Sequence, residues 1–401
     1  ALYTKEEVLA YVQEEDVKFI RLAFCDILGR QKNISILSDE LRRAFEDGIS
    51  FDASAIEGFS SVVKSDLFLF PDPSTLSVLP WRPTTGKVVR MFCDIRYPDG
   101  TQFEKDCRYI LKQAVKAASE KGISLNFGAE IEFYLFKLDE NGEPTDIPID
   151  NATYMDIAPE DKGENIRREI CLTLLDMNIK PESSHHEEGP GQNEIVFNYS
   201  DPVTAADNAA TFKMVVRTVA MRNGFYANFM PKPLPGKSGN GMHINMSIES
   251  RDGIDHSESF MAGILKHIRE ITLFMNPCVN SYMRLGERKA PKYITWSPEN
   301  RSQLIRVPAA TGKYRRIELR SPDPMANPYI AFALLIHAGL DGINNNLKAG
   351  EPVNIDLFTA DKSITSKLEQ LPASLAEAVE LAKNSAFVNA ILPREFVELY
   401  L

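Results

Sequence analysis

The sequence contains few cysteines, and they form no recognisable pattern. Five cysteines are scattered over 401 residues, and no two of them have the C-x-x-C spacing. An odd, unpatterned set argues against a disulfide framework and a structural zinc site, and favours free thiols in a reducing compartment. The first ten residues, ALYTKEEVLA, also lack the apolar core of a secretory signal. We therefore expect a cytoplasmic protein.

Long apolar runs are missing as well. No stretch approaches the ~20 apolar residues that a membrane-spanning helix requires, so we expect no membrane partner. Hydrophobic residues still make up 44% of the chain and charged residues 25%, as in a globular protein with a large core. Because 401 residues exceed the usual size of one domain, the length favours two domains.

Acidic residues outnumber basic residues over the whole chain, but basic residues are concentrated in one part of it. The formal net charge is −11, which excludes general binding to nucleic acid, because such binding requires a basic surface. Between Ser281 and Arg320, however, ten lysines and arginines accompany three acidic residues. A solvated basic face would explain such a stretch. The alternative is a binding site for a small anion, such as a nucleotide phosphate or a carboxylate.

The order of helix and strand patterns predicts an α+β protein. Segments between residues 17 and 98 are typical of short strands separated by turns, as in a small mixed domain. A turn at Pro98 to Gly100 then leads into a helix expected over 105–121, which Gly122 ends. Further strands alternate irregularly with helices expected near 163–177, 203–223, 258–275, 326–347 and 374–383. We therefore place the two domains at 1–98 and 99–401.

Four segments of the second region have apolar residues on one strand face and reactive residues on the other. Side chains alternate along a strand, so residues two apart share a face. The segments are GAEIEFYLF with Glu130 and Glu132, HHEEGPGQNEIVFN with Glu187 and Glu194, GMHINMSI with His243, Asn245 and Ser247, and RRIELR with Arg316, Glu318 and Arg320. Each segment alone is explained by the solvent side of a half-exposed antiparallel sheet.

Together, the residues singled out in the four segments include five carboxylates and one imidazole. Oxygen-rich sites with a single nitrogen suit Mg²⁺ or Mn²⁺ better than zinc. Two such cations flanked by arginines are typical of phosphoryl transfer, in which fixed positive charge neutralises the transferred group. Gly236, Lys237 and Ser238 imitate the end of a phosphate-binding P-loop. That motif is rejected because Pro231 replaces the required glycine and a strand follows.

The same segments resemble, in order, the signatures of type I glutamine synthetases. The six are GAEIEFYLF, HHEEGPGQNE, KPLPGKSGNGMHINMS, NSYMRL, WSPENRSQLIRVP and RRIELRSPDPMANPYIA, while FDASAIEGF and SDLFLFPDPST resemble that family's N-terminal motifs. The resemblance covers the chain from about Val17 to Tyr400. It implies a small β-grasp-like N-terminal domain and a larger catalytic domain with an antiparallel sheet flanked by helices. It also implies a dodecamer of two stacked hexameric rings, in which neighbouring subunits share each active site.

The resemblance further implies the reaction and the residues that perform it. ATP would phosphorylate the glutamate side chain, and ammonia would then displace phosphate to give glutamine. The family's roles fall on metal ligands Glu132, Glu187 and Glu194, metal ligands Glu130, His243 and Glu318, ATP contacts Glu182, Asn245, Ser247, Lys313 and Arg316, glutamate contacts Gly239, Arg284 and Arg320, phosphate and acyl-phosphate contacts Arg301 and Arg306, and ammonium-binding Asp52. Two or more Mg²⁺ or Mn²⁺ ions would serve each site.

Three positions depart from the family's usual pattern, and all concern the nitrogen donor. Lys289 stands where the family usually has a glutamate that closes over the site, in a loop one residue shorter. Ala55 and Ser238 replace a serine and an asparagine. These changes leave three hypotheses open. The protein is a glutamine synthetase, a glutamate–amine ligase of the same fold, or a catalytically silent assembly protein. The last is disfavoured because all six metal ligands are present.

Overall fold

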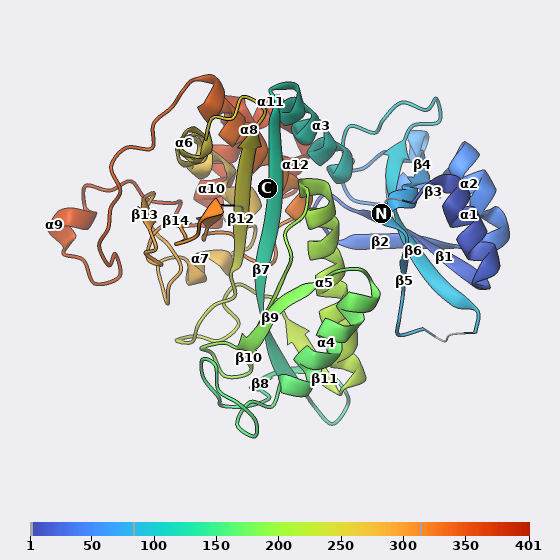
Figure 1. Cartoon of the computed structure of the whole chain (residues 1–401), viewed down its shortest axis with the longest axis horizontal. Coiled ribbons are helices and arrows are strands. Elements are labelled where there is room, and N and C mark those ends of the chain that lie inside the picture. The colour runs from blue at the N-terminus through green and yellow to red at the C-terminus, as the bar shows by residue number, and fades with distance from the viewer. Residues whose placement is uncertain (1–2, 83–84, 313–314) are drawn as a thin grey trace.

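The computed structural model describes residues 3–82, 85–312 and 315–401. Two β-sheets dominate the described residues (Figure 1). The first sheet has the strand order β2-β1-β6-β4-β3, with β5 paired to β6. Its elements are α1 (Lys5–Glu14), β1 (Val17–Cys25), β2 (Gln31–Leu37), α2 (Leu41–Asp47), β3 (Ile49–Asp52), β4 (Asp66–Pro71), β5 (Ser77–Val78) and β6 (Lys87–Arg96).

The second sheet has the strand order β13-β14-β15-β12-β7-β10-β9, and β8 and β11 also pair with β7. Its strands are β7 (Ile123–Leu138), β8 (Pro144–Pro148), β9 (Pro181–His186), β10 (Gln192–Phe197), β11 (Phe225–Asn228), β12 (Met242–Ser250), β13 (Trp296–Pro298), β14 (Ile305–Val307) and β15 (Ile317–Leu319). The predicted antiparallel sheet is confirmed for the strands that carry the reactive residues. The edge pair β13 and β14 is parallel.

The helices of the second region lie close to the ranges that the sequence predicts. They are α3 (Cys107–Glu120), α4 (Glu164–Asp176), α5 (Pro202–Arg222), α6 (Ser257–Met275), α7 (Ser281–Arg284), α8 (Pro328–Asn344), α9 (Lys362–Thr365), α10 (Leu375–Lys383), α11 (Ala386–Ile391) and α12 (Glu395–Glu398). The short helices α2, α7, α9, α11 and α12 were not predicted. None of the helices in the described ranges combines the length and hydropathy needed to cross a membrane.

The long strand β7 explains how the core and the reactive residues are separated. Phe127 and Phe133 belong to its buried face, where their rings contact Phe332 of α8 and Phe212 of α5. The intervening positions face away from these helices and carry the glutamates that line a pocket. The alternation along one strand therefore anchors the second sheet to its helices and presents carboxylates on the other side.

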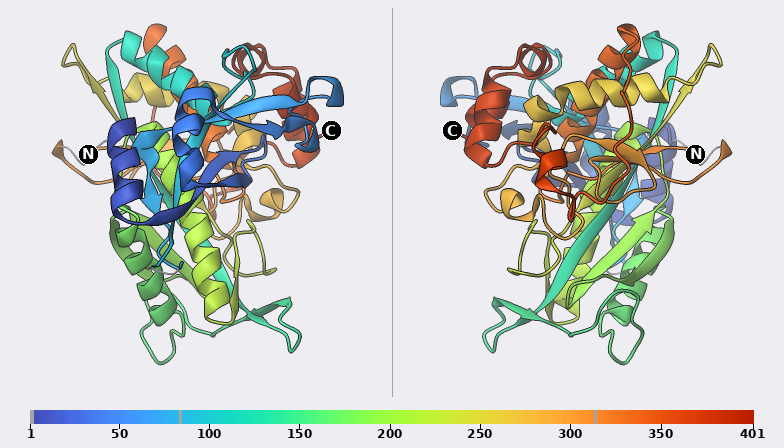
Figure 2. Two further views of the ribbon diagram at one scale, coloured as in Figure 1. Left: turned by 90° about the vertical axis from the view of Figure 1, so that its right-hand side faces the viewer. Right: turned by 90° about the vertical axis from the view of Figure 1, so that its left-hand side faces the viewer.

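The two sheets occupy opposite sides of the molecule. In Figure 1 the strands of the first sheet lie on the right, while β13 and β14 at the edge of the second sheet lie on the left. The side views agree, because the N-terminal elements face the viewer in the left panel of Figure 2 and lie behind the rest in the right panel. This placement matters for Asp52, which ends β3.

Candidate active site

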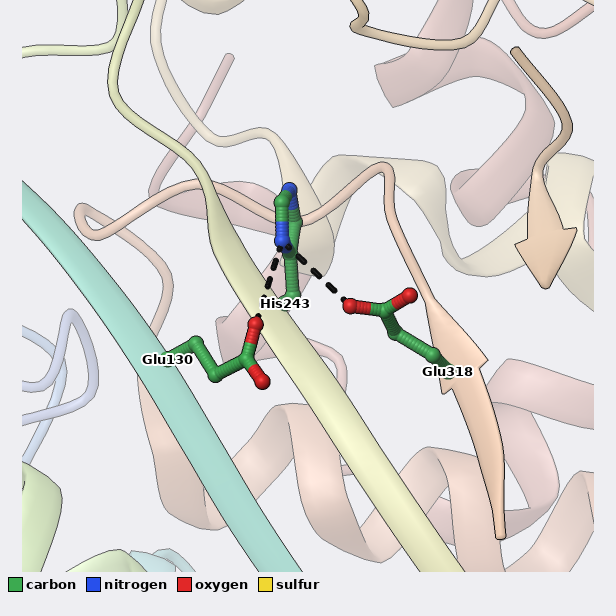
Figure 3. Close-up of side chains that lie close together, drawn as sticks. All are labelled: Glu130, His243 and Glu318. Carbon is green, nitrogen blue, oxygen red and sulfur yellow. Dashed lines mark ion pairs between the residues drawn. The ribbon is translucent and has the colours of Figure 1, made fainter. Parts of the chain in front are cut away.

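Glu130, His243 and Glu318 come together from three neighbouring strands (Figure 3). His243 is the register partner of Glu130 between β12 and β7, and Glu318 lies on β15, the other neighbour of β12. The Nδ1 atom of His243 is 3.5 Å from Glu130 Oε2 and 3.6 Å from Glu318 Oε1. The structure therefore unites the three residues that the sequence grouped as one metal-binding set.

A second cluster lies where β9, β10 and β7 adjoin. Glu194 is paired with Glu132 on β7 and with His185 on β9. His185 Nε2 lies 2.9 Å from Glu187 Oε1 and 3.9 Å from Glu194 Oε1. Sequence reasoning predicted Glu132, Glu187 and Glu194 but missed His185. The doubled histidine that precedes Glu187 was a signal, but the sequence does not say which of the two imidazoles faces the site.

Gly241 lets three of these groups approach one another. A Cβ atom at this position would lie 2.9 Å from Glu132 Oε1, from His243 Nε2 and from Arg284 Nη2. Such distances are too short for a carbon atom, so any side chain here would push the converging groups apart. The Gly241 N–H also donates a hydrogen bond of 2.7 Å to Glu132 Oε1. The glycine thus fixes one carboxylate beside the imidazole.

The carboxylates are crowded enough to shift their protonation. Burial, followed by the charge of Glu187, raises the pKa of Glu132 to about 8. Burial and the neighbouring glutamates also raise the pKa of Glu194 well above its ordinary value. Burial, with help from Arg320, lowers the pKa of His243, which keeps its imidazole neutral. Carboxyl groups that ionise readily only when a cation compensates their charge, beside a neutral imidazole, are the properties expected of ligands for a divalent cation.

Glu318 has a different environment, because arginines already compensate its charge. Arg306 Nη1 donates to Glu318 Oε2 at 3.0 Å, and Arg320 Nη1 donates to the same oxygen at 3.2 Å. Burial alone would raise the pKa of Glu318, but His243, Arg320 and Arg306 outweigh it and lower the pKa to about 2. Its other oxygen, Oε1, faces His243. Glu318 is therefore ionised and links the arginines to the first cluster.

Arg284 and Arg316 donate hydrogen bonds to neutral oxygen atoms. Arg284 donates to the carbonyl oxygens of Ser321 and Arg320, at 2.7 and 3.1 Å. Arg316 donates to Asn245 Oδ1 at 3.0 Å. Within the described ranges, the buried Arg320 Nε and Asn245 Nδ2 atoms have no hydrogen-bond partner. Buried donors without partners are costly unless a ligand completes them.

Most of the predicted site residues line one pocket of about 590 Å³. Asn245 and Ser247 instead line an adjoining crevice, together with Arg316 and Tyr199. Asp52 is exposed at the end of β3 and is not among the residues that line the pocket. Lys313 lies outside the described residues. The predicted residues in the pocket are Glu130, Glu132, Glu182, Glu187, Glu194, Gly239, His243, Arg284, Arg301, Arg306, Arg316, Glu318 and Arg320.

Two ion pairs show how the charged residues of the loop around Lys289 are arranged. Lys289 lines the pocket, and its Nζ atom lies 2.9 Å from Glu188 Oε1. Glu287, two residues earlier in the same loop, forms an ion pair of 3.0 Å with Lys232 and is not among the pocket-lining residues. Of the two residues, Lys289 therefore faces the site. Sequence reasoning missed Glu188, although it directly follows Glu187.

A buried network holds Glu187 in place from behind. The His186 ring lies 2.6 Å from the Glu187 carbonyl oxygen through Nδ1 and 2.9 Å from Asp150 Oδ1 through Nε2. Asp150 also accepts hydrogen bonds from the Lys162 and Gly191 N–H groups. The hydrogen bond to Asp150, added to that of the Glu187 carbonyl, raises the pKa of His186 against the effect of burial. This cluster is satisfied internally, so it supports the site and does not extend it.

Two protein-family models match this chain and identify the class of protein to which it belongs. Residues 16–98 match the model described as the glutamine synthetase beta-Grasp domain, and residues 104–401 match the glutamine synthetase catalytic domain. Together these matches span nearly the whole chain. The protein belongs to the glutamine synthetase family.

Relatives and solved structures agree with this assignment. The chain is 47% identical to a glutamine synthetase of Methanosarcina mazei, with 99% of this chain and 92% of the relative aligned. It is 46% identical to a glutamine synthetase of Clostridium saccharobutylicum, with 98% and 92% aligned. The structure of GmaS in complex with ADP is similar at 30% identity and a TM-score of 0.89, covering 98% of this chain and 94% of that chain. Plasmodium falciparum glutamine synthetase is similar at 25% identity and a TM-score of 0.87, covering 100% and 95%.

Proposed function

We propose that this protein joins ammonia to the side-chain carboxylate of glutamate at the expense of ATP, giving glutamine. The convergence of two carboxylate–imidazole clusters and a set of arginines in one pocket carries this proposal. The glutamine synthetases at 44–47% identity over nearly the whole chain support it. Such a pocket can bind a highly charged nucleotide and metal ions together, which a pocket of one charge sign cannot do.

The two clusters fit divalent cations by the chemistry of their donor atoms. Glu130, His243 and Glu318 would hold one ion. Glu132, Glu187 and Glu194 would hold another, with His185 within reach of the same position. Oxygen donors with few imidazoles favour Mg²⁺ or Mn²⁺. When bound, these cations neutralise phosphate oxygens during phosphoryl transfer.

Different residues of the pocket and the adjoining crevice would contact the two anionic substrates, ATP and glutamate. Glu182, Asn245, Ser247, Arg316 and Lys313 are assigned to ATP. Arg301 and Arg306 are assigned to its phosphates and to the acyl phosphate. Arg284, Arg320 and the backbone at Gly239 are assigned to glutamate. The unpartnered Arg320 Nε atom supports this assignment, because a substrate carboxylate would satisfy it.

The reaction follows from this placement in two steps. The arginines orient the glutamate carboxylate in line with the terminal phosphate, and phosphoryl transfer yields ADP and γ-glutamyl phosphate. Ammonium then loses a proton, the ammonia formed attacks the carbonyl carbon, and the leaving phosphate takes the second proton, which gives the amide and inorganic phosphate. Asp52 of a neighbouring copy would bind the ammonium ion and receive its proton. Holding the acyl phosphate among fixed cations stabilises it until the nitrogen donor arrives.

A shared site requires an assembly. Asp52 lies on the first sheet and is not among the pocket-lining residues of its own chain, so it would complete the pocket of an adjacent copy. The exposed Val62 and Val63 in the following loop support a contact surface there. We assign a dodecamer of two stacked hexameric rings, a cytoplasmic location, and domains at 1–98 and 99–401. Sedimentation of the active enzyme tests the assembly, and a fully active monomer would contradict it.

One assay tests the function and its alternative. Phosphate release is measured with glutamate and ATP in the presence of ammonium or of a panel of small primary amines. We expect glutamate-dependent release with ammonium as the best donor. A primary amine that gives a higher kcat/KM than ammonium would instead establish an amine ligase. Absence of release with every donor, from an assembled and metal-loaded protein, would contradict both enzymatic hypotheses.

A further inference from the structure

The ion pair between Lys289 and Glu188 has no part in the assigned metal, ATP or glutamate sites. Lys289 Nζ donates to Glu188 Oε1 at 2.9 Å. The other oxygen of Glu188 accepts from Ser238 Oγ at 3.4 Å. The Glu188 N–H donates to Glu187 Oε2 at 3.1 Å, so its backbone is fixed directly beside the second cluster. A carboxylate that is oriented by its own backbone and by the Ser238 hydroxyl therefore holds a primary ammonium group.

The pair stands at the boundary of the catalytic pocket. Glu188, Lys289 and Ser238 line the main pocket and also an outer cavity of about 670 Å³. Tyr154 and Arg288 are shared between the two cavities in the same way. A small cation that passes from the outer cavity to the catalytic pocket would therefore meet Glu188.

The group that Glu188 holds is itself chemically similar to the nitrogen donor. A lysine side chain ends in a positively charged nitrogen with three N–H donors, and an ammonium ion is the same head group with a fourth hydrogen. A position that accepts one through the Glu188 carboxylate can accept the other. We infer that Glu188 is the carboxylate that receives the ammonium ion at the pocket boundary. In the free protein, Lys289 occupies this cation position as a tethered competitor.

The strength of the pair suits a competitor that can be displaced. The side chains of Lys289 and Glu188 are 55% and 37% exposed. Ion pairs with this exposure are weak, because water solvates both partners when they separate. A tethered group nevertheless has an effective concentration on the order of millimolar, so it raises the ammonium concentration needed for occupancy. Arg288 anchors the same loop through a 2.7 Å hydrogen bond to the Gly236 carbonyl oxygen.

This inference rests on the proposed function, and two nitrogen donors separate the tests of the two. Ammonium is charged near neutral pH, whereas hydroxylamine is largely uncharged and has no need of a carboxylate to attract it. We expect Glu188→Gln to raise the KM for ammonium about five- to tenfold, and to change the KM for hydroxylamine much less. Lys289→Met should lower the KM for ammonium by a similar factor. In a Glu188→Gln background the Lys289 change should have little further effect.

Matched controls come from the same loop. Glu287→Gln removes an acidic charge whose partner is Lys232, and Lys292→Met removes an exposed positive charge outside the pocket lining. Both should leave the ammonium KM within about twofold of the wild type. The inference is overturned if Glu188→Gln changes the KM for both donors equally, or if Lys289→Met raises the KM for ammonium. Wild-type protein that releases no phosphate with either donor would instead overturn the proposed function.

In that case a binding measurement tests the cation position. Ammonium chloride should raise the Tm of the wild type more than the Tm of Glu188→Gln, with sodium chloride as the reference.

Discussion

The two ends of the pocket are constructed differently. At the metal end, carboxylates on adjacent strands are fixed by β-sheet register, and Glu318 is almost fully buried between two arginines. At the proposed nitrogen-donor end, Glu188 and Lys289 project from loops and form a partly exposed pair, and under the proposed function a neighbouring copy supplies Asp52. Strand register specifies positions rigidly, whereas exposed loop charges can change at low cost to stability. The set of metal ligands implied by the family resemblance is therefore complete at one end, whereas Lys289 departs from that pattern at the other.

The largest effect should follow from removing one ligand at the metal end. Glu318→Gln keeps the shape of the side chain but removes the charge that Arg306 and Arg320 share with the first cluster. We expect phosphoryl transfer to fall on the order of 10³-fold, as measured by glutamate-dependent phosphate release. Sedimentation of the variant provides the control for assembly. Near-normal activity at saturating Mg²⁺ would show that the site is wrongly assigned.

A second experiment asks whether the two ends belong to different subunits. Asp52→Asn and Glu194→Gln should each be nearly inactive alone. When the two variants are unfolded together and reassembled in equal amounts, about a quarter of the shared sites should contain both native residues, and activity should recover to about that fraction. No recovery from mixed assemblies would place both residues in the site of one chain. Reassembled wild-type protein sets the reference value.

The difference between the two ends also marks what the sequence predicts and what it does not. The helix expected near 374–383 is present as α10, and Ser374 Oγ caps it by accepting a hydrogen bond from the Glu377 N–H at 3.1 Å. The strand faces of Glu130, His243 and Glu318 were predicted because alternation is a local property. His185 was missed because it lies on the edge strand β9, and Glu188 was missed because it lies in the loop that follows. The direction of both side chains depends on the surrounding structure. Ion-pair partners in loops are set by tertiary packing, which no local pattern encodes.

A third prediction concerns the pH dependence of metal stabilisation. Burial and Glu187 raise the pKa of Glu132 to about 8, so the metal-free protein holds protons there that the unfolded chain releases at much lower pH. The contribution of this group to folding therefore becomes unfavourable as pH rises from about 4.5 towards 8. A bound cation would relieve that cost, because it replaces the proton.

The rise in Tm caused by saturating Mg²⁺ or Mn²⁺ should thus be larger at pH 8 than at pH 6, by several degrees. Thermal unfolding followed by fluorescence, with and without metal, measures it. Glu132→Gln should flatten the difference because the titrating carboxyl group is gone. A metal-induced shift that is equal at both pH values would mean that Glu132 releases no proton when metal binds.

The smallest effect is expected on the stability of the protein when Lys289 is replaced. This prediction tests directly whether the loop charges near the pocket contribute to the fold. Lys232 and Lys289 both form ion pairs with glutamates around the same loop. Lys232 has a side chain only 5% exposed, whereas that of Lys289 is 55% exposed. An exposed pair contributes about 0 to 1 kcal/mol, whereas replacement of the buried Lys232 side chain also removes packing contacts that an exposed side chain does not make.

Lys289→Gln should therefore change the Tm of the assembled protein by less than about 2 °C, whereas Lys232→Gln should lower it by several degrees. The two variants remove the same charge from the same kind of residue, so burial is the principal difference between them. If Lys289→Gln destabilises the protein as much as Lys232→Gln, the loop charges at the nitrogen-donor end are structural. They would then not be free to vary with the donor, and the contrast between a rigid metal end and an adjustable donor end would fail.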